Sequence, residues 1–346
     1  MLIEDGPTTT AEKIAERFIA ALRTPFEVAG KPAHLSASIG IAFNGGEVRS
    51  ADDILRNADV AMYTAKGRGK GRVETFELSM HAAVVARLEL RADLEHALER
   101  SEFRLRYQPV FALAGGGLHS FETLLRWRHP QRGEVLPNDF VPLAEETGLI
   151  VPIGRWVLEK ACEQAKAWVD GGRPELRVSV NVSSRQLREP EFVAWVAEAL
   201  ARTGLDPDRL ILELTESGIM QDDEGRLLAL RAIGVHLALD DFGTGYSSLS
   251  YLARFPIEIL KIDHSFTAQL GSDGEDSALI RSVIQLASAM ELTTVAEGIE
   301  RQDQLDRLKD MGCTYAQGYL LARPMDAIRA TALVNSAPSM SRASAS

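Results

Sequence analysis

The 346-residue sequence contains only two cysteines, Cys162 and Cys313. They build neither a disulfide framework nor a zinc-binding spacing, and are typical of core thiols in a reducing cytosol. The sequence also lacks any apolar run near the roughly 20 residues that a membrane-spanning helix needs. Its N-terminus has no signal-peptide pattern. We therefore expect a cytoplasmic protein with no membrane segment in this chain.

Basic residues are outnumbered, with 38 Lys and Arg against 49 Asp and Glu and a formal net charge of −11. A protein that binds a nucleic acid polymer usually presents a broad basic surface, so we expect no such partner. An anionic ligand would need a local arginine, lysine or metal ion to balance its charge. The length allows one large domain or two.

An apolar run, Leu237-Ala238-Leu239, ends in two adjacent carboxylates, Asp240 and Asp241, and a turn with two glycines follows. Neighbouring acids at the end of a buried strand repel each other unless a cation lies between them, and a divalent metal would remove that cost. Considered alone, the stretch fits a solvated Asp-Asp turn equally well.

After Arg100 the chain alternates short apolar runs with helix-length amphipathic stretches, which predicts parallel strands joined by crossover helices. Eight runs in roughly 230 residues fit an α/β fold of the TIM-type (β/α)8 barrel better than an open sheet. The runs are Phe103–Val110, His119–Leu125, Leu176–Val182, Arg209–Leu214, His236–Leu239, Ile257–Ile262, Leu292–Ala296 and Cys313–Ala316. The first two are joined through Gly115-Gly116-Gly117, too short a link for a crossover helix. We expect an antiparallel hairpin there.

Polar residues interrupt or end these runs, where a barrel gathers its active site. They are Gln108, Glu122, Asn181, Glu213, Asp240 with Asp241, Lys261, Glu297 and Gln317. Oxygen ligands without His or Cys favour Mg²⁺ or Mn²⁺ over zinc or copper. Several carboxylates around one point suggest two metals, a pair that clamps the attacking and leaving oxygens of a displacement at phosphorus. Lys261 would stay protonated and either hold the nucleophilic water or balance charge.

These residues resemble the EAL family of cyclic-di-GMP phosphodiesterases from roughly residue 88 to 334. The stretch from Glu122 to Trp127 stands where the family has its name-giving Glu-Ala-Leu, with Thr123 in place of alanine, which adds a hydroxyl near the site. Further matching segments are Tyr107-Gln108-Pro109-Val110, Pro142–Ile150, Asn181-Val182-Ser183, Glu213-Leu214-Thr215-Glu216, Asp240–Ser248, Lys261-Ile262-Asp263, Ala296–Glu300 and Gln317-Gly318-Tyr319-Leu320.

The resemblance implies roles for individual residues. It implies that the first metal is held by Glu122, Asn181, Glu213 and Asp240, and that the second is served by Asp241 and Glu297. Glu297 with Lys261 would activate the water, and Glu216 would anchor the Phe242–Ser248 loop, which in the family links dimerisation and metal binding. The residues lining the ligand cleft would be Gln108, Leu124, Arg126, Asp263, Gln317 and Tyr319, with Glu300 supporting the site.

The function that the resemblance implies is metal-dependent hydrolysis of cyclic-di-GMP to linear pGpG by a homodimer formed through the EAL domain. Two alternatives stay open, namely a receptor that binds cyclic-di-GMP without cleaving it and a protein-interaction module. The intact acid set of Glu213, Asp241 and Glu297, together with Lys261, favours the enzyme.

The first eighty residues show a second resemblance. Ser38–Ala42 and Asp59–Lys66 are similar to the carboxyl-terminal half of a GGDEF (diguanylate cyclase) domain, whose signature half is missing here. We expect a partial α+β region without cyclase activity at 1–79, a connecting helix at 80–100, the barrel at 101–335 and a disordered tail at 336–346. The connecting helix could pack on the next domain or pair as a coiled coil.

Overall fold

The computed structural model describes residues 3, 8–22, 26–28, 31–33, 35–44, 50–67, 69, 71–220, 224–243, 254–270 and 275–336. The chain forms two compact units, residues 1–93 and 94–346. The boundary falls within helix α3 (Leu78–Ala97), which ends three residues before the predicted connecting helix does. None of the described helices is long and apolar enough to cross a membrane. The Thr244–Ser248 part of the predicted loop and the tail from 337 lie outside the described residues.

The first unit is a small α+β arrangement. Its elements are α1 (Thr8–Leu22), β1 (Phe26–Val28), β2 (Lys31–Ala33), β3 (Ile39–Ile41), α2 (Ala51–Gly67) and β4 (Val73–Thr75). β1 and β2 pair antiparallel, whereas β3 and β4 pair parallel on either side of α2 in the chain. A Cβ at Gly40 would lie 2.0 Å from the carbonyl oxygen of Ala58, so this glycine lets α2 pack directly on β3.

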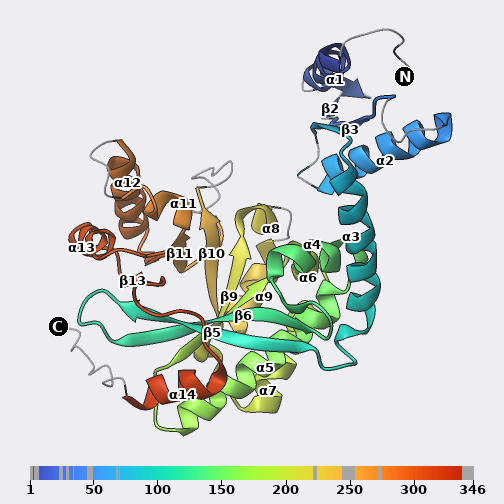
Figure 1. Ribbon diagram of the computed structural model, residues 1–346. Coiled ribbons are helices and arrows are strands. Elements are labelled where there is room, and N and C mark those ends of the chain that lie inside the picture. The colour runs from blue at the N-terminus through green and yellow to red at the C-terminus, as the bar shows by residue number, and fades with distance from the viewer. Residues whose placement is uncertain are drawn as a thin grey trace. The chain divides into compact units, whose positions relative to one another are not determined.

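The second unit is a closed barrel of eight strands with helices outside it, which confirms the predicted fold (Figure 1). Its strands are β5 (Phe103–Ala112), β6 (Leu118–His129), β8 (Arg177–Val182), β9 (Leu210–Thr215), β10 (His236–Phe242), β11 (Ile259–Ile262), β12 (Thr293–Ala296) and β13 (Tyr315–Ala316). The order around the barrel is β5-β13-β12-β11-β10-β9-β8-β6, and β6 pairs back with β5. A ninth strand, β7 (Gly133–Val135), extends β6 outside the closed ring.

The helices follow the strands in the expected alternation. They are α4 (Pro137–Thr147), α5 (Ile150–Asp170), α6 (Ser184–Leu187), α7 (Phe192–Thr203), α8 (Glu216–Met220), α9 (Glu224–Ile233), α11 (His264–Thr267), α12 (Glu275–Ala289), α13 (Gln302–Asp310) and α14 (Ala327–Ser336). Gly148 and Gly204 end α4 and α7 in the left-handed conformation that glycine adopts without strain. The helices therefore cover apolar strands that are buried on both faces.

The irregular part of the barrel is where the glycine-rich link predicted it. β5 runs antiparallel to both of its neighbours, β6 and β13. Tyr107 and Phe121 pack against Trp168 of α5 on the helix-facing side of the hairpin. Figure 1 shows α5 and α14 on this side of β5 and β6. Thr123 lies opposite Tyr107 and alternates with Glu122, so its hydroxyl points toward the helices. The expectation that Thr123 adds a hydroxyl near the site is therefore wrong.

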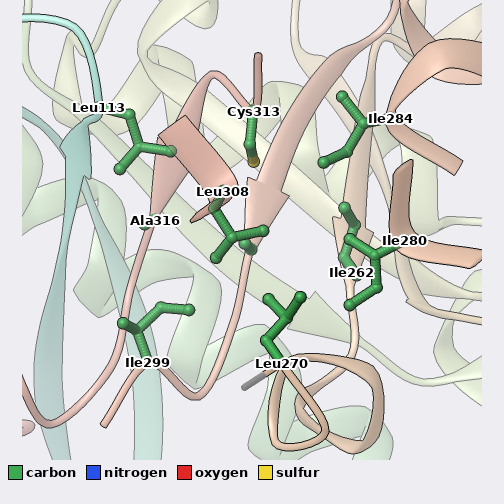
Figure 2. Close-up of a cluster of buried hydrophobic side chains, with 10 residues drawn as sticks. Leu113, Ile262, Leu270, Ile280, Ile284, Ile299, Leu308, Cys313 and Ala316 are labelled. Atoms are coloured by element: carbon green, nitrogen blue, oxygen red, sulfur yellow. The ribbon is translucent and has the colours of Figure 1, made fainter. Parts of the chain in front are cut away.

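A second apolar cluster holds α11, α12 and α13 against β11, β12 and β13. Figure 2 shows its side chains turned toward one another. They include Ile262, Leu270, Ile299 and Leu308, each at most 1% exposed. This packing fixes the backbone at the carboxyl ends of β11 and β12, where Lys261 and Glu297 lie.

Candidate active site

The ammonium group of Lys261 lies among four carboxylates at the centre of the barrel's carboxyl end. Its Nζ atom is 2.7 Å from Glu297 Oε1, 2.8 Å from Glu213 Oε2, 2.9 Å from Asp240 Oδ1 and 3.9 Å from Glu122 Oε1. Lys261 is 3% exposed, and the acids come from four different strands or strand ends. The structure therefore brings these five predicted residues together.

Strand geometry explains this convergence. Glu122 lies within β6, but only residues 120–123 of that strand pair with the parallel strand β8, so Glu122 stands at the same level as the other acids. Glu213 and Asp240 come late in β9 and β10, and Glu297 follows β12 directly. Parallel strands end at the same rim, so side chains at these positions must share one space.

The cluster carries more negative than positive charge. Burial raises the pKa of Glu213 well above its usual value, although Lys261 opposes the shift. Burial likewise raises the pKa of Glu297. Burial alone would lower the pKa of Lys261, but the surrounding carboxylates outweigh it and raise that pKa well above normal. Four carboxylates around one ammonium thus favour the uptake of protons or further cations.

Two amide side chains complete the cluster. Asn181 donates from Nδ2 to Glu122 Oε1 at 2.9 Å, while Gln317 donates from Nε2 to Glu122 Oε2 at 2.6 Å and to Glu297 Oε1 at 3.3 Å. Gln317 is 5% exposed, and its Oε1 atom is buried with no hydrogen-bond partner. An unpaired buried acceptor is costly, so this oxygen fits a donor supplied by a bound water or ligand.

Asp241 is held in a strained backbone conformation. Its φ angle of +54° lies in the left-handed region, and the pairing of β10 with β11 shifts register between Leu239 and Phe242. This irregularity turns the Asp241 side chain to the solvent-exposed rim while Asp240 points inward. Partial desolvation of the carboxyl at this rim, together with the neighbouring Asp240, raises the pKa of Asp241. Backbone strain of this kind concentrates at functional sites.

The predicted cleft residues lie along the hairpin and the β13 rim. Gln108 is buried opposite Glu122 and donates to the Ala322 carbonyl at 3.3 Å. Strand alternation puts Leu124 and Arg126 on the face that carries Glu122. Tyr319 is 51% exposed, and the guanidinium of Arg323 lies 4.4 Å from its ring centroid.

Three other predicted residues lie outside the acid cluster. Asp263 caps α11 by accepting a hydrogen bond from the Ser265 amide at 2.9 Å. Glu216 is the first residue of α8, and Glu300 is exposed in the loop after β12. The predicted anchoring of the Phe242–Ser248 loop by Glu216 stays a prediction, because only Phe242 and Gly243 of that loop are among the described residues.

His119, at the floor of the barrel below the cluster, adds no positive charge. A small cavity inside the barrel is bordered by Glu213, Lys261, Ser179 and, toward the amino end, His119. The His119 ring stacks on Tyr315 with 3.8 Å between centroids. Burial, aided by repulsion from Arg177 and His236, lowers the pKa of His119 to about 3, so this imidazole is neutral at pH 7.

The donor set fits a hard divalent cation, because it offers carboxylate and amide oxygens and excess negative charge. Among the described residues, no three His, Cys, Asp or Glu side chains stand spaced to hold a metal ion. Lys261 lies between the acids instead. The fit to a metal therefore rests on the chemistry of the donors and on the unpaired Gln317 oxygen.

Residues 91–324 match the family described as EAL domain. The chain belongs to the EAL domain family. Residues 2–72 match the family described as Diguanylate cyclase, GGDEF domain. Both predicted resemblances are confirmed, and the acid cluster lies entirely within the EAL domain.

Several relatives of this EAL domain chain are similar over nearly its whole length. The bifunctional diguanylate cyclase/cyclic di-GMP phosphodiesterase MucR of Pseudomonas aeruginosa is 43% identical over 330 residues, which cover 94% of this chain and 48% of MucR. The cyclic di-GMP phosphodiesterase PdeR of Escherichia coli is 37% identical over 331 residues, covering 95% and 50%. The chain thus spans about half the length of the curated relatives it matches.

Solved structures of EAL proteins are similar to this chain as well. The PaMucR phosphodiesterase in complex with c-di-GMP is 45% identical, with a TM-score of 0.67, and the match covers 70% of this chain and 99% of that chain. The EAL enzyme Bd1971, in its form with bound cAMP and cyclic-di-GMP, is 33% identical with a TM-score of 0.70, covering 73% and 70%.

Sequence reasoning missed some residues that the structure brings beside the predicted cleft residues. Glu134, on the short strand β7, lies 4.0 Å from Arg126 Nε and 3.6 Å from the Arg106 guanidinium. Arg323 stacks on Tyr319. No spacing marks these contacts, because β7 has only three residues and Arg323 follows an irregular turn.

Proposed function

We propose that this chain hydrolyses cyclic-di-GMP to linear pGpG in a metal-dependent reaction. The observation that carries the proposal is the buried convergence of Glu122, Glu213, Asp240 and Glu297 on Lys261. Relatives of similar sequence over this region are named as cyclic di-GMP phosphodiesterases. No part of this acid set is missing from the chain.

Two divalent cations, Mg²⁺ or Mn²⁺, fit the proposal. Glu122, Asn181, Glu213 and Asp240 would hold one of them, and Asp241 with Glu297 would hold the other. When bound, such ions stabilise the charge that develops on the attacking and leaving oxygens at phosphorus. The excess negative charge of the cluster supports this assignment, because hard cations neutralise it without protonating the acids.

The chain's own residues then handle the proton and the substrate. Glu297 accepts the proton of the attacking water as the new P–O bond forms and the P–O3′ bond breaks. The leaving O3′ takes up a proton from solvent, so the product carries a 5′-phosphate and a 3′-hydroxyl. Lys261, 2.7 Å from Glu297, keeps that carboxylate oriented. Gln317 offers its unpaired Oε1 to a donor on the water or the ligand.

Arg126 is the residue that would bind a substrate phosphate. It is half-buried near the acids, on the face of β6 that carries Glu122, and it pairs only loosely with Glu134. A phosphate would replace Glu134 as the partner of this guanidinium, because a phosphate accepts two parallel hydrogen bonds from arginine.

Arg126→Ala is expected to raise KM for cyclic-di-GMP by about tenfold or more, the loss of one charge-assisted contact of about 1.5–3 kcal/mol. Steady-state kinetics would measure it. Arg155→Ala, which removes an exposed arginine paired with Glu198 on the outer helices, provides the control and should leave KM unchanged. An unaltered KM in Arg126→Ala would exclude this contact.

One assay tests the function. The purified chain is incubated with cyclic-di-GMP and Mg²⁺ or Mn²⁺, and the products are separated by chromatography. Formation of pGpG supports the proposal. Binding without turnover would instead identify a receptor, and the absence of both would leave a protein-interaction module.

Divalent ions should act selectively. Removal of metals with EDTA is expected to abolish turnover, and Mg²⁺ or Mn²⁺ should restore it. Excess Ca²⁺ should inhibit, because Ca²⁺ takes longer bonds, about 2.3–2.6 Å, and a looser geometry than Mg²⁺. Chromatographic rates at fixed Mg²⁺ with increasing Ca²⁺ would measure this. Undiminished turnover in Ca²⁺ would argue against a tight two-metal site.

The homodimer through the EAL domain and the cytoplasmic location stay predictions. Gel filtration with light scattering, with and without cyclic-di-GMP, would test the first.

A further inference from the structure

Thr267 ties the loop that carries Glu297 to the segment that follows Lys261. It is the last residue of α11 and is fully buried, at 0% exposed. Its hydroxyl lies 2.5 Å from the Glu297 carbonyl oxygen and 3.1 Å from the His264 carbonyl. A hydroxyl has one proton to donate, and the shorter contact assigns it to Glu297.

Gln304 continues this connection from the other side. It is 1% exposed within α13. Its Oε1 accepts from the Glu300 and Arg301 amides, each at 2.9 Å, and its Nε2 donates to the Thr267 carbonyl at 2.9 Å. One buried amide therefore fixes both the loop after β12 and the end of α11.

The loop after β12 and the α11 segment pack directly against each other. Gly298 has a φ angle of +67°, and a Cβ there would lie 2.1 Å from the His264 ring. On the other side, Ile262, Leu270, Ile299 and Leu308 belong to one buried cluster (Figure 2). A shift of one segment must therefore be passed to the other.

We propose that Thr267 and Gln304 are positioning residues that set the separation between the Glu297 carboxylate and the Lys261 ammonium. The backbone of Glu297 is held at both ends by the β11–α11 segment, since its amide donates to the Ile262 carbonyl at 3.1 Å and its carbonyl accepts from Thr267. Lys261 immediately precedes Ile262 in that segment. The hydrogen bonds of Thr267 and Gln304, which we call the brace, thus fix the position of the proposed general base relative to the lysine beside it. In naming Glu297 as the base, the inference rests on the proposed function.

The test is Thr267→Val, which keeps the shape of the side chain and removes the donor. Because the Thr267 hydroxyl contacts the Glu297 carbonyl and none of the predicted cleft side chains, kcat is expected to fall by about tenfold while KM stays within about twofold, as small misplacements of a catalytic group do. Thr267→Ser restores the hydroxyl and should recover most of kcat. A purely structural role would lower the melting temperature without this split between kcat and KM.

Thr294→Val is the matched control. Thr294 is also on the β12 side of the barrel, is 2% exposed, and accepts from the Thr314 amide at 3.0 Å near the start of the strand. This variant should lose stability but retain kcat. An equal loss of kcat in Thr267→Val and Thr294→Val would overturn the inference.

A crystal structure of Thr267→Val separates this inference from the proposed function. We expect the distance from Lys261 Nζ to the Glu297 carboxylate to lengthen in the variant, whether or not the wild type is active. An unchanged distance overturns the positioning role. If the wild type fails to turn over cyclic-di-GMP while the distance lengthens, the proposed function fails and the brace stands.

Discussion

Lys261→Met is expected to lower the free energy of unfolding of the metal-free barrel by about 3–5 kcal/mol, because it removes the single cation from a group of buried acids. Methionine fills a similar volume, so packing should change little. The substitution removes the ammonium group that pairs with Glu213, Asp240 and Glu297. The buried acids must then take up protons to remain buried. Denaturant unfolding monitored on the barrel transition would measure the loss.

The pH dependence of that loss has a definite sign. Burial already raises the pKa of Glu213 and Glu297 on folding. A carboxyl with a raised pKa destabilises the folded state once the pH exceeds its pKa in the unfolded chain, so the penalty should grow from about pH 5 to pH 8. Adding Mg²⁺ should recover more stability in Lys261→Met than in the wild type, because metal binding to the folded state stabilises it.

Lys160→Met provides the control for this experiment. Lys160 is exposed and pairs with Glu163 at 2.6 Å on the outside of the barrel. An exposed ion pair of this kind contributes at most about 1 kcal/mol. If Lys261→Met behaved like Lys160→Met, the acids of the cluster would have to be neutral already, and the charge argument for a metal site would fail.

The barrel was predictable because its strands have a simple signature. Buried parallel strands appear as short apolar runs, and six of the eight runs agree with the observed strands to within two residues at each end. The first exception is β6, which continues four residues past its run, to His129, where it pairs with β7. β10 continues into Asp240, Asp241 and Phe242 because a register shift lets the strand run past its apolar part.

The candidate site was predictable in composition and not in arrangement. Polar residues at the ends of apolar runs must gather at the rim, so Glu122, Glu213, Asp240 and Glu297 could be named from the sequence. The central place of Lys261 depends on the length and direction of its side chain inside the barrel, which no spacing encodes. The left-handed φ of Asp241 arises from pairing with β11, a contact distant in sequence.

The brace formed by Thr267 and Gln304 could not be predicted from the sequence, for a different reason. Gln304 acts as the third residue of α13 and accepts from the amide of the residue before the helix, as in a capping box. That residue is Arg301 instead of Ser or Thr, so the usual sequence signature is absent. Thr267 looks like one more β-branched residue after an aspartate-capped turn. Its role follows only from the approach of the Glu297 carbonyl.

Glu297→Gln is expected to reduce kcat by about 10²–10⁴-fold, the usual contribution of a general base, while cyclic-di-GMP still binds. The amide has the shape of the carboxylate and can still accept from Lys261 and Gln317, but it cannot take a proton from water. KM should change by less than about threefold, because Arg126 and the cleft residues are untouched. Steady-state kinetics and calorimetric titration of the ligand would measure the two effects.

The same substitution should raise the melting temperature of the metal-free protein. Glu297 is one of four carboxylates facing a single ammonium, and its raised pKa means that ionising this carboxyl at neutral pH costs the folded state free energy. Removing that charge relieves repulsion, so activity and stability should move in opposite directions, as expected where a site is built for function. Glu198→Gln, which changes an exposed acid paired with Arg155, should alter neither. A retained kcat would remove Glu297 from the base role, and a lower melting temperature would contradict the excess of negative charge on which the metal assignment depends.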